Sequence, residues 1–182
     1  MNTMEEKIKK SAKAVDIATK IFYIAMTVCA CMIAVGIIWS LVYPAAATYQ
    51  LNDRVSLASP LFNMSFRSRA HMYSWCIYTL ADSCVLISIL LLTNRIFHDI
   101  SLSGAPFEAI YAKRIKTISI LMLIDAIAVP VIFRTLVDAL LHPEVVEHGV
   151  NGTLAVVAVI FLCLSYIFQY GSELQRLNDE TL

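Results

Sequence analysis

Charged side chains are scarce in this chain of 182 residues: Lys, Arg, Asp and Glu make up 15% of it, and hydrophobic residues make up 59%. An average soluble domain has about 25% charged and about 45–50% apolar residues. A single soluble domain of this length cannot bury so much apolar surface, because its surface is large relative to its volume. The composition therefore argues against a soluble enzyme, a nucleic-acid-binding domain and a disordered segment.

The sequence motifs of common enzymes are absent as well. None of GxxxxGK[ST], GxGxxG, GxSxG or HExxH occurs, and no Ser, His and Asp set is suggested by position. The basic residues fall in short separate segments without the interleaved aromatic residues of a nucleic-acid platform. We therefore expect no enzyme, no cofactor and no direct contact with nucleic acid.

A metal centre or a disulfide framework is not expected either. Glu144 and His148 are four residues apart, a spacing that places two ligands on one helical face, and His142 and Glu147 lie nearby. These residues do not complete a metal motif, and they are equally typical of a solvated turn. The odd number of cysteines, all inside apolar segments and without CxxC, predicts free and packed thiols: Cys29, Cys31, Cys76, Cys84 and Cys163.

The charges leave four gaps along the chain, and a membrane-spanning helix needs about 20 mainly apolar residues. Residues 21–43 and 153–170 contain no charge, whereas 72–93 and 117–133 each contain one acid. We predict an all-α membrane protein, with these four segments as transmembrane helices of one bundle in a single domain, 1–182.

The distribution of basic residues predicts the orientation, because Lys and Arg are enriched in cytoplasmic loops. One side holds ten of them: Lys7, Lys9, Lys10, Lys13, Lys20, Arg95, Lys113, Arg114, Lys116 and Arg176. The other side holds four: Arg54, Arg67, Arg69 and Arg134. We therefore expect a bacterial inner-membrane protein with both termini in the cytoplasm and with outer loops at 44–71 and 134–152. Association of several copies is left open.

Three segments outside the membrane would lie on the cytoplasmic side. Residues 1–20 read as an amphipathic helix that runs into the first span, serving as a basic anchor or as a docking helix for a partner. Residues 94–116 read as a basic hairpin, with Pro106 opening its second helix and Glu108 in the first turn. The tail, 171–182, is acidic, and we expect it to contact the hairpin. The apolar outer loop 44–71 is expected to pack on the bundle or at the lipid interface.

Asp82 and Asp125 are the most informative residues, because a charge at the centre of a membrane helix costs about 2.5–3.5 kcal/mol on insertion scales. In antiparallel neighbouring helices both acids would lie at similar depth, and if they face each other, both cannot be ionised. Such a pair could serve a proton or cation relay or a polar ligand pocket. Alternatively, each acid is neutral and purely structural. The structural hydrogen-bond partners would be Ser83, Ser88, Tyr78 or a backbone carbonyl freed near Pro130.

Pro130 lies inside the third apolar segment and lacks a backbone N–H. It should kink the helix and leave the carbonyl of Ala126 without its usual amide partner.

Three motifs resemble a known family. The hairpin reads Asn-Arg-Ile-Phe at 94–97 and Gly-Ala-Pro-Phe at 104–107. The last helix ends Tyr-Ile-Phe-Gln-Tyr-Gly-Ser-Glu-Leu-Gln at 166–175, and the chain closes Asn-Asp-Glu-Thr-Leu. Together with the four-span layout, these motifs resemble the DUF2975 family of small bacterial four-helix membrane proteins of unknown function.

The resemblance implies a partner rather than a reaction. Genes for such proteins often lie beside one for a very small helix-turn-helix regulator, which suggests by association a membrane protein that holds or modulates that regulator. The interaction surface would then be Arg95, Phe97, Gly104, Pro106, Phe107, Gly171, Leu174, Gln175, Asp179 and Glu180. The alternative is a small transporter or channel component that uses Asp82 and Asp125.

Overall fold

The computed structural model describes residues 3–42, 48–51, 54–57, 65–66, 69–103, 108–133, 135 and 149–180. Four long helices pack as a bundle, and each is long and apolar enough to cross a membrane. They are α1 Thr3–Val42, α3 Arg69–Ser103, α4 Ala109–Leu123 and α6 Gly152–Glu180. The helix of α4 continues through a π-helical turn, η1 Ile124–Ala128, to Phe133. The predicted all-α class with four apolar helices is confirmed.

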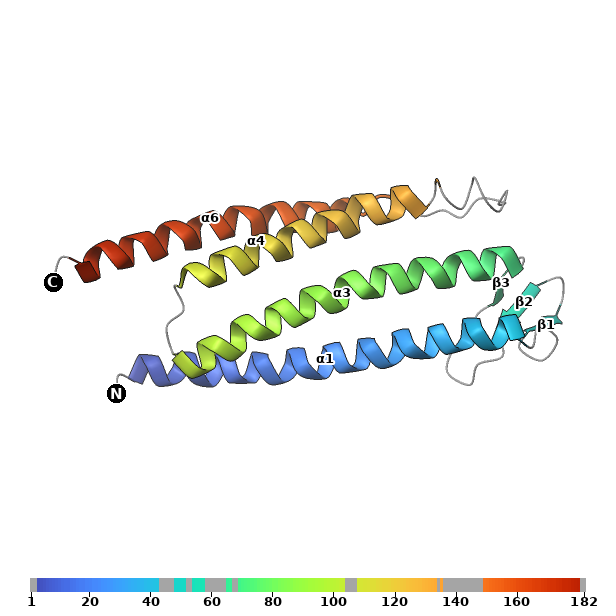
Figure 1. Cartoon of the computed structure of the whole chain (residues 1–182), viewed down its shortest axis with the longest axis horizontal. Helices are drawn as coiled ribbons and strands as arrows, with labels where there is room; N and C mark the ends of the chain where they lie inside the picture. Colours follow the sequence, from blue (N-terminus) through green and yellow to red (C-terminus); the bar gives the residue numbers. More distant parts are fainter. Residues whose placement is uncertain are drawn as a thin grey trace.

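The bundle is built from two helix pairs. The α1 helix packs along α3, α6 packs along α4, and a smaller α3–α4 contact joins the pairs (Figure 1). Both chain termini lie at the same end of the bundle, which we call the inner end (Figure 1). The opposite end, which carries the strands, is the outer end.

The two longest helices, α1 and α3, extend well beyond the thickness of a membrane. The 40 residues of α1 extend about 60 Å and the 35 of α3 about 52 Å, against a hydrocarbon core of about 30 Å. The uncharged part of α1 begins at Ile21, so the part before it projects from the inner end as a continuation of the span, as predicted. The tail is helical as well, because α6 continues to Glu180.

The outer segment contains a small antiparallel sheet that the sequence patterns did not indicate. Its strands are β1 Thr48–Leu51, β2 Arg54–Leu57 and β3 Ser65–Phe66, in the order β1-β2-β3. Thr48 pairs with Leu57, and Val55 pairs with Phe66. Strands of two to four residues are too short for the two-residue alternation to stand out from a mixed loop. The predicted packing of the rest of this loop lies outside the described residues.

Few apolar side chains are buried inside the bundle, as expected for helices that face lipid. Met72 and Cys76 form a small core with Ile33 and Ile37 between α1 and α3. Large apolar residues on α1 and α6 remain exposed, including Ile21, Phe22, Val28, Val35, Ile38, Val156, Val159, Ile160 and Ile167. All five cysteines are free thiols, but the expectation that they are packed is wrong for Cys29, Cys31, Cys84 and Cys163, which are exposed.

Candidate functional site

The two intramembrane acids meet between α3 and η1. Asp82 lies on α3 and Asp125 lies in the π-helical turn, and their carboxyl groups interact with each other. Asp125 is 4% exposed, and its Oδ1 atom has no hydrogen-bond partner in the described part of the chain. Two carboxyl groups in contact cannot both be ionised, because like charges repel strongly away from water. Such a pair is stabilised when one of its two carboxyl groups carries a proton.

The π-helical turn and Pro130 give Asp125 its position. The Val129 amide bonds to the Ile124 carbonyl, one residue further back than in an α-helix. Pro130, which is fully buried, has no amide to offer the carbonyl of Ala126, as predicted. That carbonyl instead accepts a 3.0 Å hydrogen bond from the backbone amide of Asn151. The start of α6 thus replaces the missing intrahelical bond.

An aromatic pair borders the two acids. The rings of Tyr78 on α3 and Phe133 are 5.5 Å apart at 76°, an edge-to-face contact. The Tyr78 phenol is also close enough to interact electrostatically with Asp82 and Asp125. The site therefore combines an apolar wall with three ionisable groups. Among the described residues, no three His, Cys, Asp or Glu side chains are grouped so that they could hold a metal ion.

A second polar cluster, at the inner end, joins α1 to α3. Asn94 donates from Nδ2 to the Asp16 carboxylate at 2.7 Å, to the Asp16 carbonyl at 2.9 Å and to Thr19 Oγ1 at 3.0 Å. Lys20 Nζ lies 2.9 Å from Asp16 Oδ2, and His98 Nδ1 lies 3.6 Å from the same oxygen. Sequence reasoning missed this cluster. Its only local sign was an Asp16–Lys20 pair one helical turn apart within a lysine-rich segment.

These partners stabilise the ionised form of the Asp16 carboxyl group. Asp16 lies before the uncharged part of α1, outside the span, yet it is only 5% exposed. Burial by itself would raise the pKa of Asp16, but the hydrogen bond and charge of Lys20, together with the nearby His98 and the hydrogen bond from Asn94, bring that pKa below its ordinary value. Asp16 is thus an ionised carboxylate between two helices at neutral pH.

The hairpin between α3 and α4 is held by one ion pair and an apolar core. Arg114 donates to Asp99 at 2.6 Å across the two helices. Tyr111, which is 1% exposed, packs with Ile96 and Ile118. The predicted start of the second helix is wrong: α4 begins at Ala109. Glu108 precedes the first turn in an extended conformation and makes no side-chain capping bond.

The predicted interaction residues fall into three groups. Arg95 is exposed and Phe97 is half-buried on α3, whereas Gly104, Pro106 and Phe107 lie outside the described residues. On α6, Gly171 is half-buried, Leu174 is 48% exposed, and Glu180 pairs with Arg176 one turn away at 3.5 Å. The backbone of Gln175 and Asp179 is helical, but their side chains lie outside the described ones.

Among the described residues, two of the cavities lie at the inner end. The first, of about 490 Å³, lies between α1 and α3 and is mainly apolar. It is lined by Lys7, Ile8, Ser11, Ala12, Val15, Phe97 and Ile100, and we call it the α1–α3 groove.

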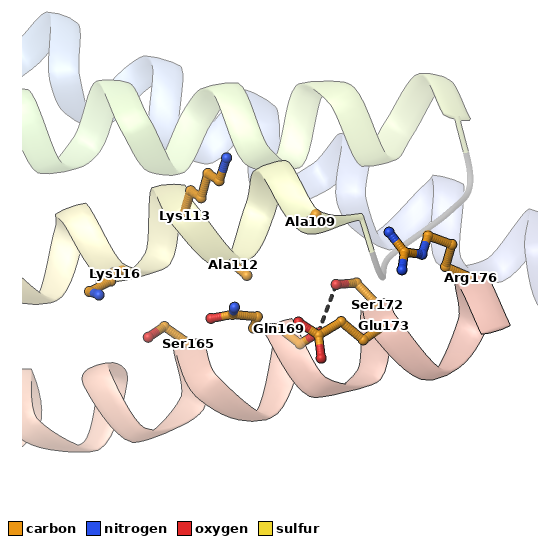
Figure 2. Close-up of a pocket in the computed structure, with 9 residues that line it drawn as sticks. All are labelled: Ala109, Ala112, Lys113, Lys116, Ser165, Gln169, Ser172, Glu173 and Arg176. Carbon is orange, nitrogen blue, oxygen red and sulfur yellow. Dashed lines mark hydrogen bonds between the residues drawn. The ribbon is translucent and has the colours of Figure 1, made fainter.

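The second cavity, of about 430 Å³, lies between α4 and α6 and is more polar (Figure 2). It is lined by Ala109, Ala112, Lys113, Lys116, Ser165, Gln169, Ser172, Glu173 and Arg176, and we call it the α4–α6 groove. Tail and hairpin residues, which the sequence led us to expect in contact, thus line one cavity together.

No family model, curated protein or solved structure matches the chain. The fold and the sites define a four-span membrane protein with a paired intramembrane acid site and two grooves at its inner end. The resemblance to the DUF2975 family stays a prediction from its motifs.

Proposed function

We propose that this protein is a non-enzymatic protein of the bacterial inner membrane that binds a small helix-turn-helix regulator at its inner end. In this proposal the inner end faces the cytoplasm, as the excess of Lys and Arg there favours. The kind of partner comes from the DUF2975 resemblance, and the docking position is inferred from the α1–α3 groove.

The α1–α3 groove is the single observation that supports this function most. Val15 is 36% exposed and Phe97 is half-buried, and both line the groove beyond the uncharged part of α1. An apolar groove of this kind suits the apolar face of a short helix. The exposed Lys7 at its rim, together with exposed Lys13 nearby, favours a partner whose helix carries acidic residues.

The two helices that form the groove are fixed against each other, and this also supports docking. The buried Asp16–Asn94 hydrogen bond, at 2.7 Å, fixes α1 against α3 next to the groove. A partner would then bind a surface that is already formed, so little conformational entropy is lost on binding.

Site-specific photocross-linking tests the docking position in intact cells. A benzophenone side chain at Phe97 should cross-link to a helix-turn-helix protein, whereas one at Ile120, an exposed residue of the spanning part of α4, should not. Val15→Glu should abolish the cross-link, and Ala14→Glu, which adds the same charge at an exposed neighbour that does not line the groove, should preserve it. Cross-linking to lipid alone at Phe97, or equal effects of both Glu variants, would overturn the proposal.

Proton-linked transport is the second candidate function, and the buried Oδ1 atom of Asp125 beside Asp82 favours it. A carboxyl pair that shares a proton can take up or release it when its surroundings change. Purified protein in vesicles with a pH-sensitive dye should then show a proton flux that Asp82→Asn abolishes. Asp99→Asn at the inner end serves as the matched control. Wild-type vesicles without flux would contradict this function and leave the docking proposal standing.

A further inference from the structure

The α4–α6 groove lies at the level where two uncharged helical segments end. On α4, Lys113 and Lys116 come directly before the apolar run that begins at Thr117. On α6, Ser172 and Arg176 lie within the two helical turns that follow Tyr170, where the fourth predicted span ends. In a membrane, this is the depth of the lipid headgroups at the inner end.

The charges that line the groove favour an anion. Lys113, Lys116 and Arg176 are positive and Glu173 is the single acid of the lining, which leaves an excess of two positive charges. Neither lysine forms an ion pair with a described residue, while Lys116 Nζ lies 5.5 Å from the centre of the Tyr166 ring. The Arg176–Glu180 pair is exposed on both sides and therefore weak.

The groove also contains hydrogen-bonding side chains and has room for a ligand. Ser165, Gln169 and Glu173 lie on the side of α6 that is turned toward α4, while Lys113 reaches toward α3 (Figure 2). Ala109 and Ala112 contribute only methyl groups on the α4 side, which leaves a cavity of about 430 Å³. A phosphate group with its neighbouring hydroxyl groups fits a site that offers cations and polar side chains in this volume.

The surface beside the groove is apolar and exposed. On α6, Ile167 and Tyr170 are each 64% exposed, and on α4 Ile120 is 45% exposed. An acyl chain attached to a bound headgroup would lie along these side chains. A soluble phosphate would not cover these apolar side chains. A basic groove beside an exposed apolar surface therefore favours a lipid.

We infer that the α4–α6 groove binds the headgroup of an anionic phospholipid from the leaflet at the inner end. Basic pockets between transmembrane helices on this side of a membrane suit such headgroups. This site is separate from the α1–α3 groove and does not depend on the proposed regulator.

Native mass spectrometry of the full chain in detergent tests the site, with phosphatidylglycerol and phosphatidylcholine as probes. We expect a one-to-one adduct with phosphatidylglycerol at concentrations where phosphatidylcholine gives none. Lys113→Ala/Lys116→Ala should weaken the adduct about thirtyfold, from the contribution of two basic residues near an anionic lipid. Lys10→Ala/Lys13→Ala removes the same charge from exposed positions of α1 outside both grooves and should leave the affinity unchanged.

A variant that fills the groove and competition with inorganic phosphate provide two further tests of the site. Ala109→Trp keeps every charge but fills the groove from an exposed position, so it should also abolish the adduct. Equal weakening by both double variants, or full binding by Ala109→Trp, would overturn the site. Displacement of the lipid by millimolar inorganic phosphate would show that free phosphate is the ligand and would overturn the lipid assignment.

Discussion

The backbone amide of Asn151, at the start of α6, donates a 3.0 Å hydrogen bond to the carbonyl of Ala126 in η1. Pro130 leaves that carbonyl without an intrahelical donor, and a different segment of the chain supplies one. The bond ties α6 to the turn that carries Asp125, so the intramembrane acid pair and the α4–α6 packing depend on a shared contact.

The Asn151 contact can be separated into its side-chain and backbone parts. Asn151→Ala removes only the 3.1 Å bond from the Leu154 amide to Oδ1, so it should cost about 1 kcal/mol as a lost helix cap. Asn151→Pro also removes the donor to Ala126 and should cost more. Adding Pro130→Ala to Asn151→Pro should recover part of that loss, because residue 130 then supplies an amide. Unfolding in denaturing detergent measures all three, and a double variant less stable than Asn151→Pro would refute the explanation.

Asn94 should be essential for the contact between α1 and α3. Asn94→Leu leaves the buried Asp16 carboxylate without its amide donor and should destabilise the protein by about 1–3 kcal/mol. The double variant Asp16→Leu/Asn94→Leu should be more stable than Asn94→Leu alone, because it leaves no buried polar group unsatisfied. Thermal unfolding in detergent measures the difference. Additive losses in the double variant would argue against a coupled pair.

The Asp16 cluster should make stability depend on pH. Because the pKa of Asp16 is lower in the folded protein than its ordinary value of 3.8, its contribution is complete above that value and is lost as the pH falls below it through the folded pKa. The difference in melting temperature between wild type and Asp16→Asn should therefore be constant above about pH 5 and shrink as the pH falls from about 4 to about 2. A difference that stays constant below about pH 4 as well would mean that the ionised form has no special stability.

Replacement of one acid in the membrane should be tolerated only if hydrogen bonding remains. Asp82→Asn keeps a polar partner for Asp125 and removes the repulsion, so we expect wild-type stability or better. Asp82→Leu leaves the buried Asp125 carboxyl without that partner and should lower the stability. Detergent unfolding at neutral pH gives the order of the three proteins. An Asn variant as unstable as the Leu variant would rule out the shared-proton description.

The tail should protect the connection between α3 and α4. Ser172, Glu173 and Arg176 line the same cavity as the first turns of α4, so deletion of 174–182 should loosen that end. Limited proteolysis near Gly104 should then become faster than in wild type. Removal of residues 1–5, at the other terminus of the inner end, provides the control. Equal cleavage of all three proteins would contradict the predicted role of the tail.

Sequence reasoning located the membrane helices well because the cost of placing charge in lipid is a property of each continuous segment. The gaps between charges matched the four helices, and the missing Ala126 partner followed directly from the chemistry of Pro130. The predicted start of the second hairpin helix was wrong, because Glu108 is extended and α4 begins at Ala109, and the exact ends of helices are weakly determined by local sequence.

The sequence by itself therefore determined the number of helices, their apolar character and the presence of two acids within them. Only the tertiary structure decided which groups meet: Asp82 with Asp125, Ala126 with Asn151, and Asp16 with Asn94, which are 78 positions apart. The physical reason is that such contacts depend on how each helix is rotated and shifted against its neighbour. A one-residue π-helical insertion changes that rotation without any trace in the hydropathy of the segment.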